Sequence, residues 1–98
     1  MKKAVELLEH IVAVKAKVLA EEHPSRLASQ HVLAIAYQAD GQVMKALELL
    51  EHIVAVEAKV LAEEHPSRLA SQHALAIAYE ADGQVKKALE LLEHIVAV

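Results

Sequence analysis

The side chains in this sequence that could do chemistry are histidines placed four residues after glutamates. Three such pairs occur, Glu6/His10, Glu48/His52 and Glu90/His94. Residues four apart share one face of a helix, so each pair could hold a divalent ion. Zinc sites in proteins bring together three or four ligands, however, and each pair offers only two. We therefore interpret the pairs as part of a polar outer helix face.

Other reactive residue types lack the surroundings that an enzyme needs. The chain has no cysteine, which excludes disulfides, thiolate metal sites and a cysteine nucleophile. Gly41 and Gly83 each stand alone, so there is no phosphate-binding loop, and no serine has the context of a nucleophile elbow. His23 and His65 each precede a proline, where we expect hydrogen bonds in a loop or at a helix start. We predict a protein that is not an enzyme, with no catalytic residue, metal or cofactor.

Composition narrows the class of protein and its partners. Of 98 residues, 55% are apolar but only Tyr37 and Tyr79 are aromatic, so Leu, Val, Ile and Ala must build the interior. Abundant Ala, Leu, Glu, Lys and Gln favour helices. The net charge of −4, without a basic patch, argues against nucleic acid as a partner. Apolar runs are too short to span a membrane. We expect no membrane segment, no signal peptide and a cytoplasmic location.

The sequence repeats itself with a period of 42 residues. Residues 2–43 align without gaps with residues 44–85 and are identical to them at 37 of 42 positions. The five differences are Lys2/Met44, Val5/Leu47, Lys15/Glu57, Val32/Ala74 and Gln38/Glu80. Such a period is typical of a solenoid, in which each unit buries its apolar face against the next. We predict a single repeat domain over residues 1–98, with a partial third unit at residues 86–98.

Each unit contains the signals of two helices. A proline suited to the first helical position and a glycine suited to a C-terminal stop bound a helix predicted over residues 67–81. The other helix, predicted over about residues 43–63, has a broad apolar arc that Lys15 and Glu57 interrupt in the two copies. The sequence therefore predicts an all-α solenoid of antiparallel helical hairpins, with five helices of which the last is truncated.

Small, apolar and glycine residues recur at fixed places in each unit. They are Leu33, Ala34, Tyr37, Gly41, Ala46, Leu50 and Ile53, and one period later Leu75, Ala76, Tyr79, Gly83, Ala88, Leu92 and Ile95. This pattern resembles the tetratricopeptide repeat (TPR) in its 42-residue form, as in kinesin light chains and the C-terminal arrays of fungal NACHT or NB-ARC receptors. Where that family usually has a large residue, this chain has Gln30 and Gln72. We expect the helices to approach closely, with the two tyrosines as the main bulky side chains between them. Each tyrosine hydroxyl should have a hydrogen-bond partner.

The resemblance implies a concave face that binds peptides. It places eight residues there: Ala28, His31, Ile35, Gln38, Ala70, His73, Ile77 and Glu80. Relatives that grip a C-terminal carboxylate have Lys and Asn at the positions of His31/Ile35 and His73/Ile77, so we do not expect such a clamp here. The groove could accept an apolar peptide or helix. Alternatively, the histidines only line solvent or pack against the next repeat, and both interpretations stay open.

The long helices at the two ends of the chain have no capping helix over their apolar faces. A solenoid has no closed core, so uncapped ends are adhesive. We expect a fragment of a longer array, or an engineered unit, that forms a homo-oligomer by stacking or by helix exchange. The residues predicted for this self-association are Leu7, Leu8, Ile11, Leu89, Leu92, Ile95 and Val96.

Three functions of different classes remain from the sequence. The leading hypothesis is a protein–protein interaction scaffold from a larger signalling or innate-immunity-type receptor, whose partner is a protein, a peptide or a second copy. The alternative is a designed or consensus-like repeat whose only activity is self-assembly. A metal-dependent enzyme is third, because no set of residues meets the geometric needs of catalysis.

Overall fold

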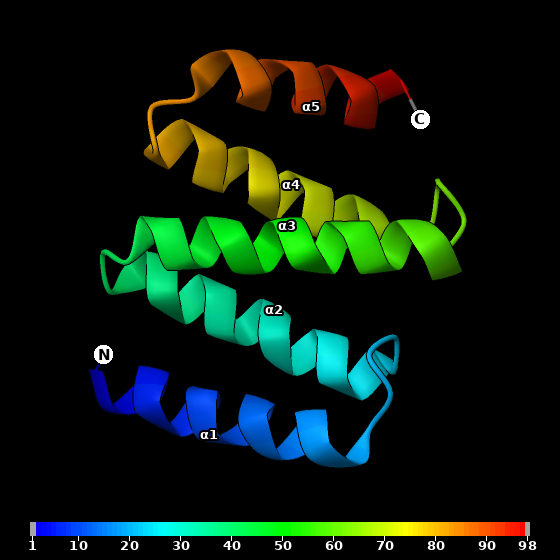
Figure 1. Cartoon of the computed structure of the whole chain (residues 1–98). Coiled ribbons are helices and arrows are strands. Elements are labelled where there is room, and N and C mark those ends of the chain that lie inside the picture. Colours follow the sequence, from blue (N-terminus) through cyan, green and yellow to red (C-terminus); the bar gives the residue numbers. More distant parts are fainter. Residues whose placement is uncertain (1, 98) are drawn as a thin grey trace.

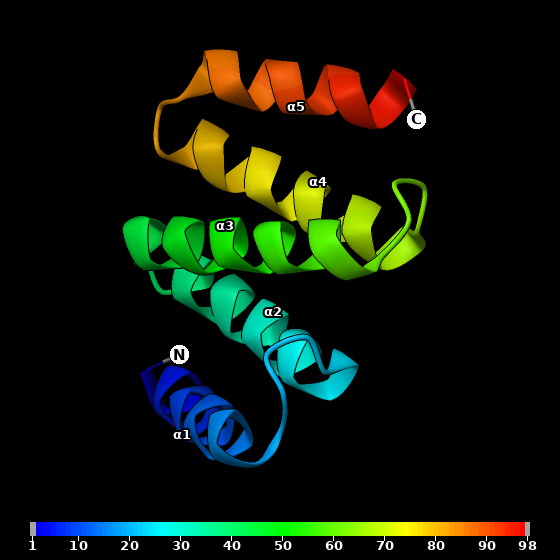
Figure 2. The same ribbon diagram turned by 45° about the vertical axis from the view of Figure 1, so that its right-hand side comes forward.

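Five helices form the part of the chain that the computed structural model describes, residues 2–97. They are α1 (Lys2–Val18), α2 (Pro24–Ala39), α3 (Val43–Val60), α4 (Pro66–Ala81) and α5 (Val85–Ala97). Each helix packs against the next one along the chain. Figures 1 and 2 show the helices stacked in sequence order, with α1 and α5 at opposite ends. The all-α solenoid of helical hairpins predicted from the sequence is confirmed.

Local signals set where helices α2 and α4 begin. Helix α4 starts at Pro66, whose fixed φ suits the first helical position and whose missing N–H has no partner there in any case. The N-cap is His65, whose Nδ1 accepts a hydrogen bond from the backbone N–H of Ser67 at 3.1 Å. Helix α2 begins in the same way, with His23 Nδ1 accepting from the Ser25 N–H at 3.1 Å. The capping role expected for these two histidines is confirmed.

The same two helices end at glycines in the left-handed region. Gly41 has a φ of 80° and Gly83 a φ of 82°, which residues with a side chain rarely adopt. The N–H of Gln84 donates to the Tyr79 carbonyl at 2.8 Å and the N–H of Gly83 to the Glu80 carbonyl at 3.0 Å. These bonds satisfy carbonyls that the helix end would leave free. The glycine stop predicted from the sequence is therefore present.

Helix α3 ends earlier than the sequence predicted. The expected end was near residue 63, but the helix stops at Val60, and Leu61 is extended with φ −118° and ψ 148°. The Arg68 guanidinium, from α4, donates to the Leu61 carbonyl at 3.3 Å. The acceptor that another helical turn would use is thus satisfied by a side chain of the next helix. Arg26 makes the same bond to the Leu19 carbonyl at 3.1 Å in the first unit, so this contact recurs with the repeat.

The hydrophobic core runs along the stack of helices, between neighbouring helices. Two groups of buried apolar residues fill it: Leu27, Ala34, Leu47, Leu50, Ile53, Val56, Leu75 and Ala78 in one, and Val5, Leu33, Ala36, Tyr37 and Ala46 in the other. Helix α3 contributes to both because it lies between α2 and α4. Gln30 and Gln72 are also buried, at the positions where the related family usually has a large residue. The interior is built from aliphatic side chains, as the composition predicted.

Each tyrosine hydroxyl has a carboxylate partner. Tyr37 donates to Glu9 Oε2 at 2.5 Å, and Tyr79 donates to Glu51 Oε2 at 2.8 Å. Burial raises the pKa of each tyrosine to about 12, and the hydrogen bond to the glutamate and its negative charge add to the rise. The expectation of a partner for each hydroxyl is confirmed. Tyr37 is buried in the core, whereas Tyr79 is only half-buried.

Candidate functional site

The residues predicted for a concave binding face all lie outside the core, on α2 and α4. On α2 they are Ala28, His31, Ile35 and Gln38, and on α4 they are Ala70, His73, Ile77 and Glu80. Spacings of three and four residues put each set on one side of its helix. Ile35 is 54% exposed and Ile77 is 46% exposed, although both are large and apolar. We call these two sets together the α2/α4 face; its role in binding stays a prediction.

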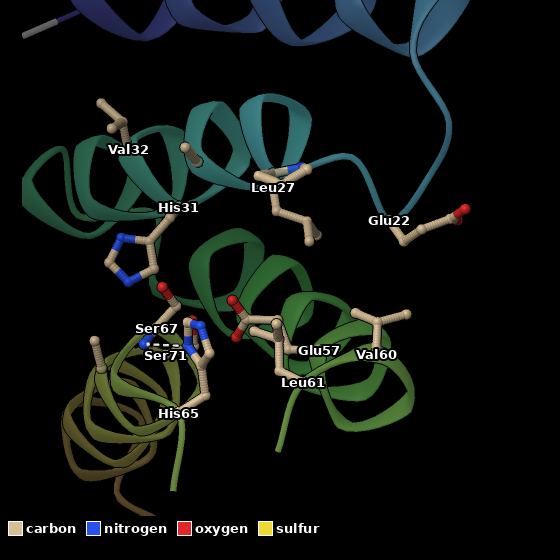
Figure 3. Close-up of a pocket in the computed structure, with 13 residues that line it drawn as sticks. Glu22, Leu27, His31, Val32, Glu57, Val60, Leu61, His65, Ser67 and Ser71 are labelled. Carbon is tan, nitrogen blue, oxygen red and sulfur yellow. Dashed lines mark hydrogen bonds between the residues drawn. The ribbon is translucent and has the colours of Figure 1, made fainter. Parts of the chain in front are cut away.

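A cavity of about 480 Å³ opens between α2, the end of α3 and the start of α4. Its residues, all drawn in Figure 3, are Glu22, Pro24, Leu27, Ala28, His31, Val32, Glu57, Val60, Leu61, His65, Ser67, Ala70 and Ser71. Three residues predicted for the concave face, Ala28, His31 and Ala70, belong to this lining. The other five predicted residues lie along the same helices beyond the cavity. The predicted concave face therefore overlaps at one end with a cavity that the sequence did not predict.

Glu57 is the polar group in this cavity that sequence reasoning missed. The residue is only 5% exposed, and its Oε1 has no hydrogen-bond partner among residues 2–97. Figure 3 shows its carboxylate between the helix that carries His31 and the helix that carries Ser71. His31 Nε2 is also buried without a partner in the described part of the chain. The available signal was that Glu57 interrupts an otherwise apolar arc.

The first unit has a different arrangement at the equivalent place. Lys15 stands where the second unit has Glu57, and its Nζ donates to Ser25 Oγ at 2.9 Å and to Ser29 Oγ at 2.7 Å. The matching serines of the second unit, Ser67 and Ser71, line the cavity. The first unit thus fills this place with its own ammonium group, and the second presents a carboxylate instead.

The glutamate–histidine pairs lie on the exposed surfaces of α1, α3 and α5. All six residues are exposed, and within residues 2–97 no three His, Asp or Glu side chains are arranged so that they could hold a metal ion. His94 instead has its Nε2 3.4 Å from Glu63 Oε1, which lies in the loop between α3 and α4. This contact joins residues 31 positions apart, so the spacing within a helix could not predict it. The pairs place polar groups on the solvent-exposed surface.

The residues predicted for self-association lie on the two terminal helices. Leu7 is 61% exposed, Leu89 is 55% exposed and Val96 is 86% exposed. Leu8, Ile11, Leu92 and Ile95 are half-buried. The apolar faces expected at the ends of the stack are present, and the assembly itself stays a prediction. None of the helices within residues 2–97 is long and apolar enough to cross a membrane.

The stacked helical hairpins define the class of protein as an α-helical solenoid, with a cavity between α2, α3 and α4. The chain belongs to the tetratricopeptide repeat family, because the family model described as "Tetratricopeptide repeat" matches residues 30–98. No curated protein matches the chain in sequence. Members of this family form protein–protein interaction scaffolds that typically bind proteins or peptides and are generally not enzymes.

Two solved structures are highly similar to this chain. One is the crystal structure of nearly identical TPR-like repeats assigned to a kinesin light chain of Podosopora anserina, with 68% identity and a TM-score of 0.95 over 98% of this chain. The other is a glutamine-to-methionine variant of those repeats, with 67% identity and a TM-score of 0.96 over 98% of this chain. This chain covers 46% of the first and 45% of the second. It therefore spans less than half the length of either.

Proposed function

We propose that this chain is a non-enzymatic scaffold that binds an apolar peptide segment of a partner protein along the α2/α4 face. The observation that carries the proposal is the exposure of Ile35 and Ile77, which are 54% and 46% exposed and stand one period apart on equivalent helices. Val32, 50% exposed, extends the apolar surface on α2. Covering such side chains removes apolar area from water, which is the main favourable term in association. Residues 1–98 act here as a single repeat domain.

The chemistry of the face favours apolar peptides over peptides that end in a free carboxylate. His31, Ile35, His73 and Ile77 stand where carboxylate-gripping relatives have Lys and Asn. The face therefore lacks the charged and amide donors that a terminal carboxylate needs. A helix or an extended strand with aliphatic residues at regular spacing fits the isoleucines better.

The test is a peptide selected from a random displayed library against the purified chain and titrated by fluorescence anisotropy. The Ile35→Lys/Ile77→Lys double variant should weaken binding about tenfold or more, because it puts two charges into the apolar contact. The matched control is Met44→Lys/Val85→Lys, which adds the same charge at exposed apolar positions away from this face. Failure to select any peptide, or equal affinities of both double variants, would contradict the proposal.

Self-association is a second candidate function, favoured by the exposed apolar residues of α1 and α5. Leu7, Leu89 and Val96 are more than half exposed, and a second copy that covers them would bury aliphatic area. Light scattering over a range of concentrations should show a homo-oligomer. The Leu92→Lys/Ile95→Lys variant should shift it toward monomer. A wild-type chain that is monomeric at every concentration would exclude this candidate.

The wider context of the scaffold is also part of the proposal. A cytoplasmic signalling or innate-immunity-type receptor is supported by the resemblance of the sequence to the fungal receptor arrays. A designed or consensus-like repeat is the alternative, supported by the identity of the two units at 37 of 42 positions. The domain composition of a longer parent chain would discriminate them, because an adjoining nucleotide-binding domain fits only the receptor.

A further inference from the structure

The buried carboxylate of Glu57 is the feature of this molecule that peptide binding by an apolar face leaves unexplained. Glu57 lines a cavity of about 480 Å³, and its buried Oε1 has no hydrogen-bond partner among residues 2–97. The walls around it are largely aliphatic, with Leu27, Val60 and Leu61 among them. Keeping a carboxylate in such surroundings is unfavourable unless a donor or a positive charge meets it. The cavity is therefore complementary to a cation with an apolar stem.

The first unit shows which cation this place accepts. There the Nζ of Lys15 lies between Ser25 Oγ and Ser29 Oγ, at 2.9 and 2.7 Å. Ser67 and Ser71 stand at the matching positions of the second unit and line the cavity. An alkylammonium group in the cavity would meet the same pair of serines and, in addition, the carboxylate of Glu57. The first unit holds its own lysine at this place, whereas Glu57 in the second unit could accept a lysine from another molecule.

We propose that the cavity binds the side-chain ammonium of a lysine residue carried by a peptide on the α2/α4 face, with Glu57 as its charged acceptor. The proposal rests on the proposed function in one respect, that a groove-bound peptide carries the lysine. The four methylenes of lysine pack along the aliphatic walls while the ammonium reaches the carboxylate. His31 Nε2, buried and unpartnered in the described chain, supplies a second acceptor when its imidazole is neutral and protonated on Nδ1.

Lysine fits this cavity better than arginine or a metal ion. An ammonium carries three donors that can point in different directions, as they do from Lys15 to two separate serines. A guanidinium prefers both oxygens of one carboxylate in a flat paired contact. A metal ion would need three or more converging ligands, and no such group exists within residues 2–97. Glu22 also lines the cavity, but its exposed side chain points away from Glu57 in Figure 3, so Glu57 is the carboxylate assigned to the cation.

The experiment titrates the chain with N-acetyl-lysine amide and follows backbone amide resonances by NMR. The comparison ligand is N-acetyl-norleucine amide, which has an uncharged methyl group in place of the ammonium. We expect saturable shifts centred on Glu57, His31 and Ser71, with the lysine amide binding about tenfold or more tightly, as for a hydrogen bond to a charged group. Equal binding of the two ligands would overturn the proposal without any variant. Tighter binding of N-acetyl-arginine amide would overturn the assignment to lysine.

Two substitutions at the acceptor sharpen the test. Glu57→Gln keeps the size of the side chain and should weaken the lysine amide about tenfold or more. Glu48→Gln, which removes an equal charge from an exposed position of the same helix, should leave the affinity unchanged. Glu57→Lys copies the first unit, where lysine is accommodated by the fold, and should abolish binding by filling the site from within. Wild-type affinity in either Glu57 variant would overturn the proposal.

The outcome separates this proposal from the proposed function. Selected peptides that bind through Ile35 and Ile77 but keep their affinity when their lysines become norleucine would overturn the lysine site and leave the scaffold intact. Lysine amide binding that depends on Glu57, in a chain for which no peptide is selected, would support the site and contradict the scaffold. N-acetyl-lysine amide thus tests binding in the cavity independently of any peptide.

Discussion

Helices α3 and α5 share the segment LELLEHIVA and yet bury it to different extents. Leu47 is 4% exposed in α3, whereas its copy Leu89 is 55% exposed in α5. Ile53 is fully buried, whereas its copy Ile95 is half-buried. The difference comes from neighbours, because α3 packs between α2 and α4, while α5 has α4 on one side. In a solenoid, the stability of a helix depends on the helices beside it as much as on its own residues.

The turns and helix caps, unlike the burial of side chains, are the same in both units. Gly41 and Gly83 differ in φ by only 2°, and His23 and His65 cap their helices with the same distance of 3.1 Å. These features depend on residues a few positions apart. Local geometry is therefore set by the repeat sequence, while burial is set by position in the stack. Substitutions in matched pairs can separate these two contributions.

The largest effect should come from removing a side chain that is buried in one copy and half-buried in the other. Ile53→Ala should lower the free energy of unfolding by about 2–5 kcal/mol, since it leaves a cavity between α2, α3 and α4. Ile95→Ala should lower it by at most about 2 kcal/mol, because less area is lost and α5 has one neighbour. Urea unfolding at low protein concentration measures both. Equal losses would show that stack position does not set the contribution.

The next effect should be the same in both units. Gly41→Ala and Gly83→Ala should each cost about 1–2 kcal/mol, because an L residue at this positive φ is strained. An added Cβ would meet no atom within 4 Å at either glycine, so strain acts without a clash. Amide hydrogen exchange on α2 and α4 would localise each loss. A much larger cost at one turn would mean that stack position influences local geometry.

Loss of the histidine caps should have a smaller and again equal effect. His23→Ala and His65→Ala each remove the acceptor for a backbone N–H, which typically costs about 1 kcal/mol at an N-cap. The control is His52→Ala, on the exposed side of α3, which should leave the stability unchanged. Urea midpoints for the three variants give the comparison. A His52→Ala loss as large as the other two would remove the capping explanation.

The sequence was sufficient for the fold because most of its signals are local and occur twice. The proline, the glycine and the apolar spacing of one unit identify a hairpin, and the period of 42 shows that hairpins stack. The eight residues assigned to the concave face lie on exposed sides of α2 and α4 for the same reason. Helical spacing fixes which side of a helix faces the core once the neighbours are known to be helices.

The parts that the sequence could not predict depend on contacts between helices. Glu57 was recognised as an interruption in an apolar arc, but the cavity over it exists only because α2 and α4 are held apart beside it. The contact between His94 and Glu63 joins α5 to a loop of the preceding unit. Beyond the early end of α3, Arg68 of α4 donates to the Leu61 carbonyl. The cavity and the His94–Glu63 contact both depend on how separate helices are placed, which the spacing within one helix does not give.

The two tyrosine–glutamate pairs give a direct test of equivalence between the units. Burial, with the adjacent glutamate, raises the pKa of Tyr37 and of Tyr79 from 10.0 to about 12. A raised pKa in the folded state stabilises it fully below the unfolded value, and this contribution is lost as the pH rises from 10.0 toward about 12.

The Tyr37→Phe/Tyr79→Phe double variant should therefore lose stability less steeply than the wild type over that pH range. Lysines titrate there as well, so the difference between the two proteins in urea unfolding is the quantity to measure. Because both pKa values rise to the same value of about 12, each single variant should remove an equal share. Unequal shares would mean that the buried Tyr37 and the half-buried Tyr79 are not equivalent. Position in the stack would then influence even a hydrogen bond that the repeat sequence encodes in both complete units.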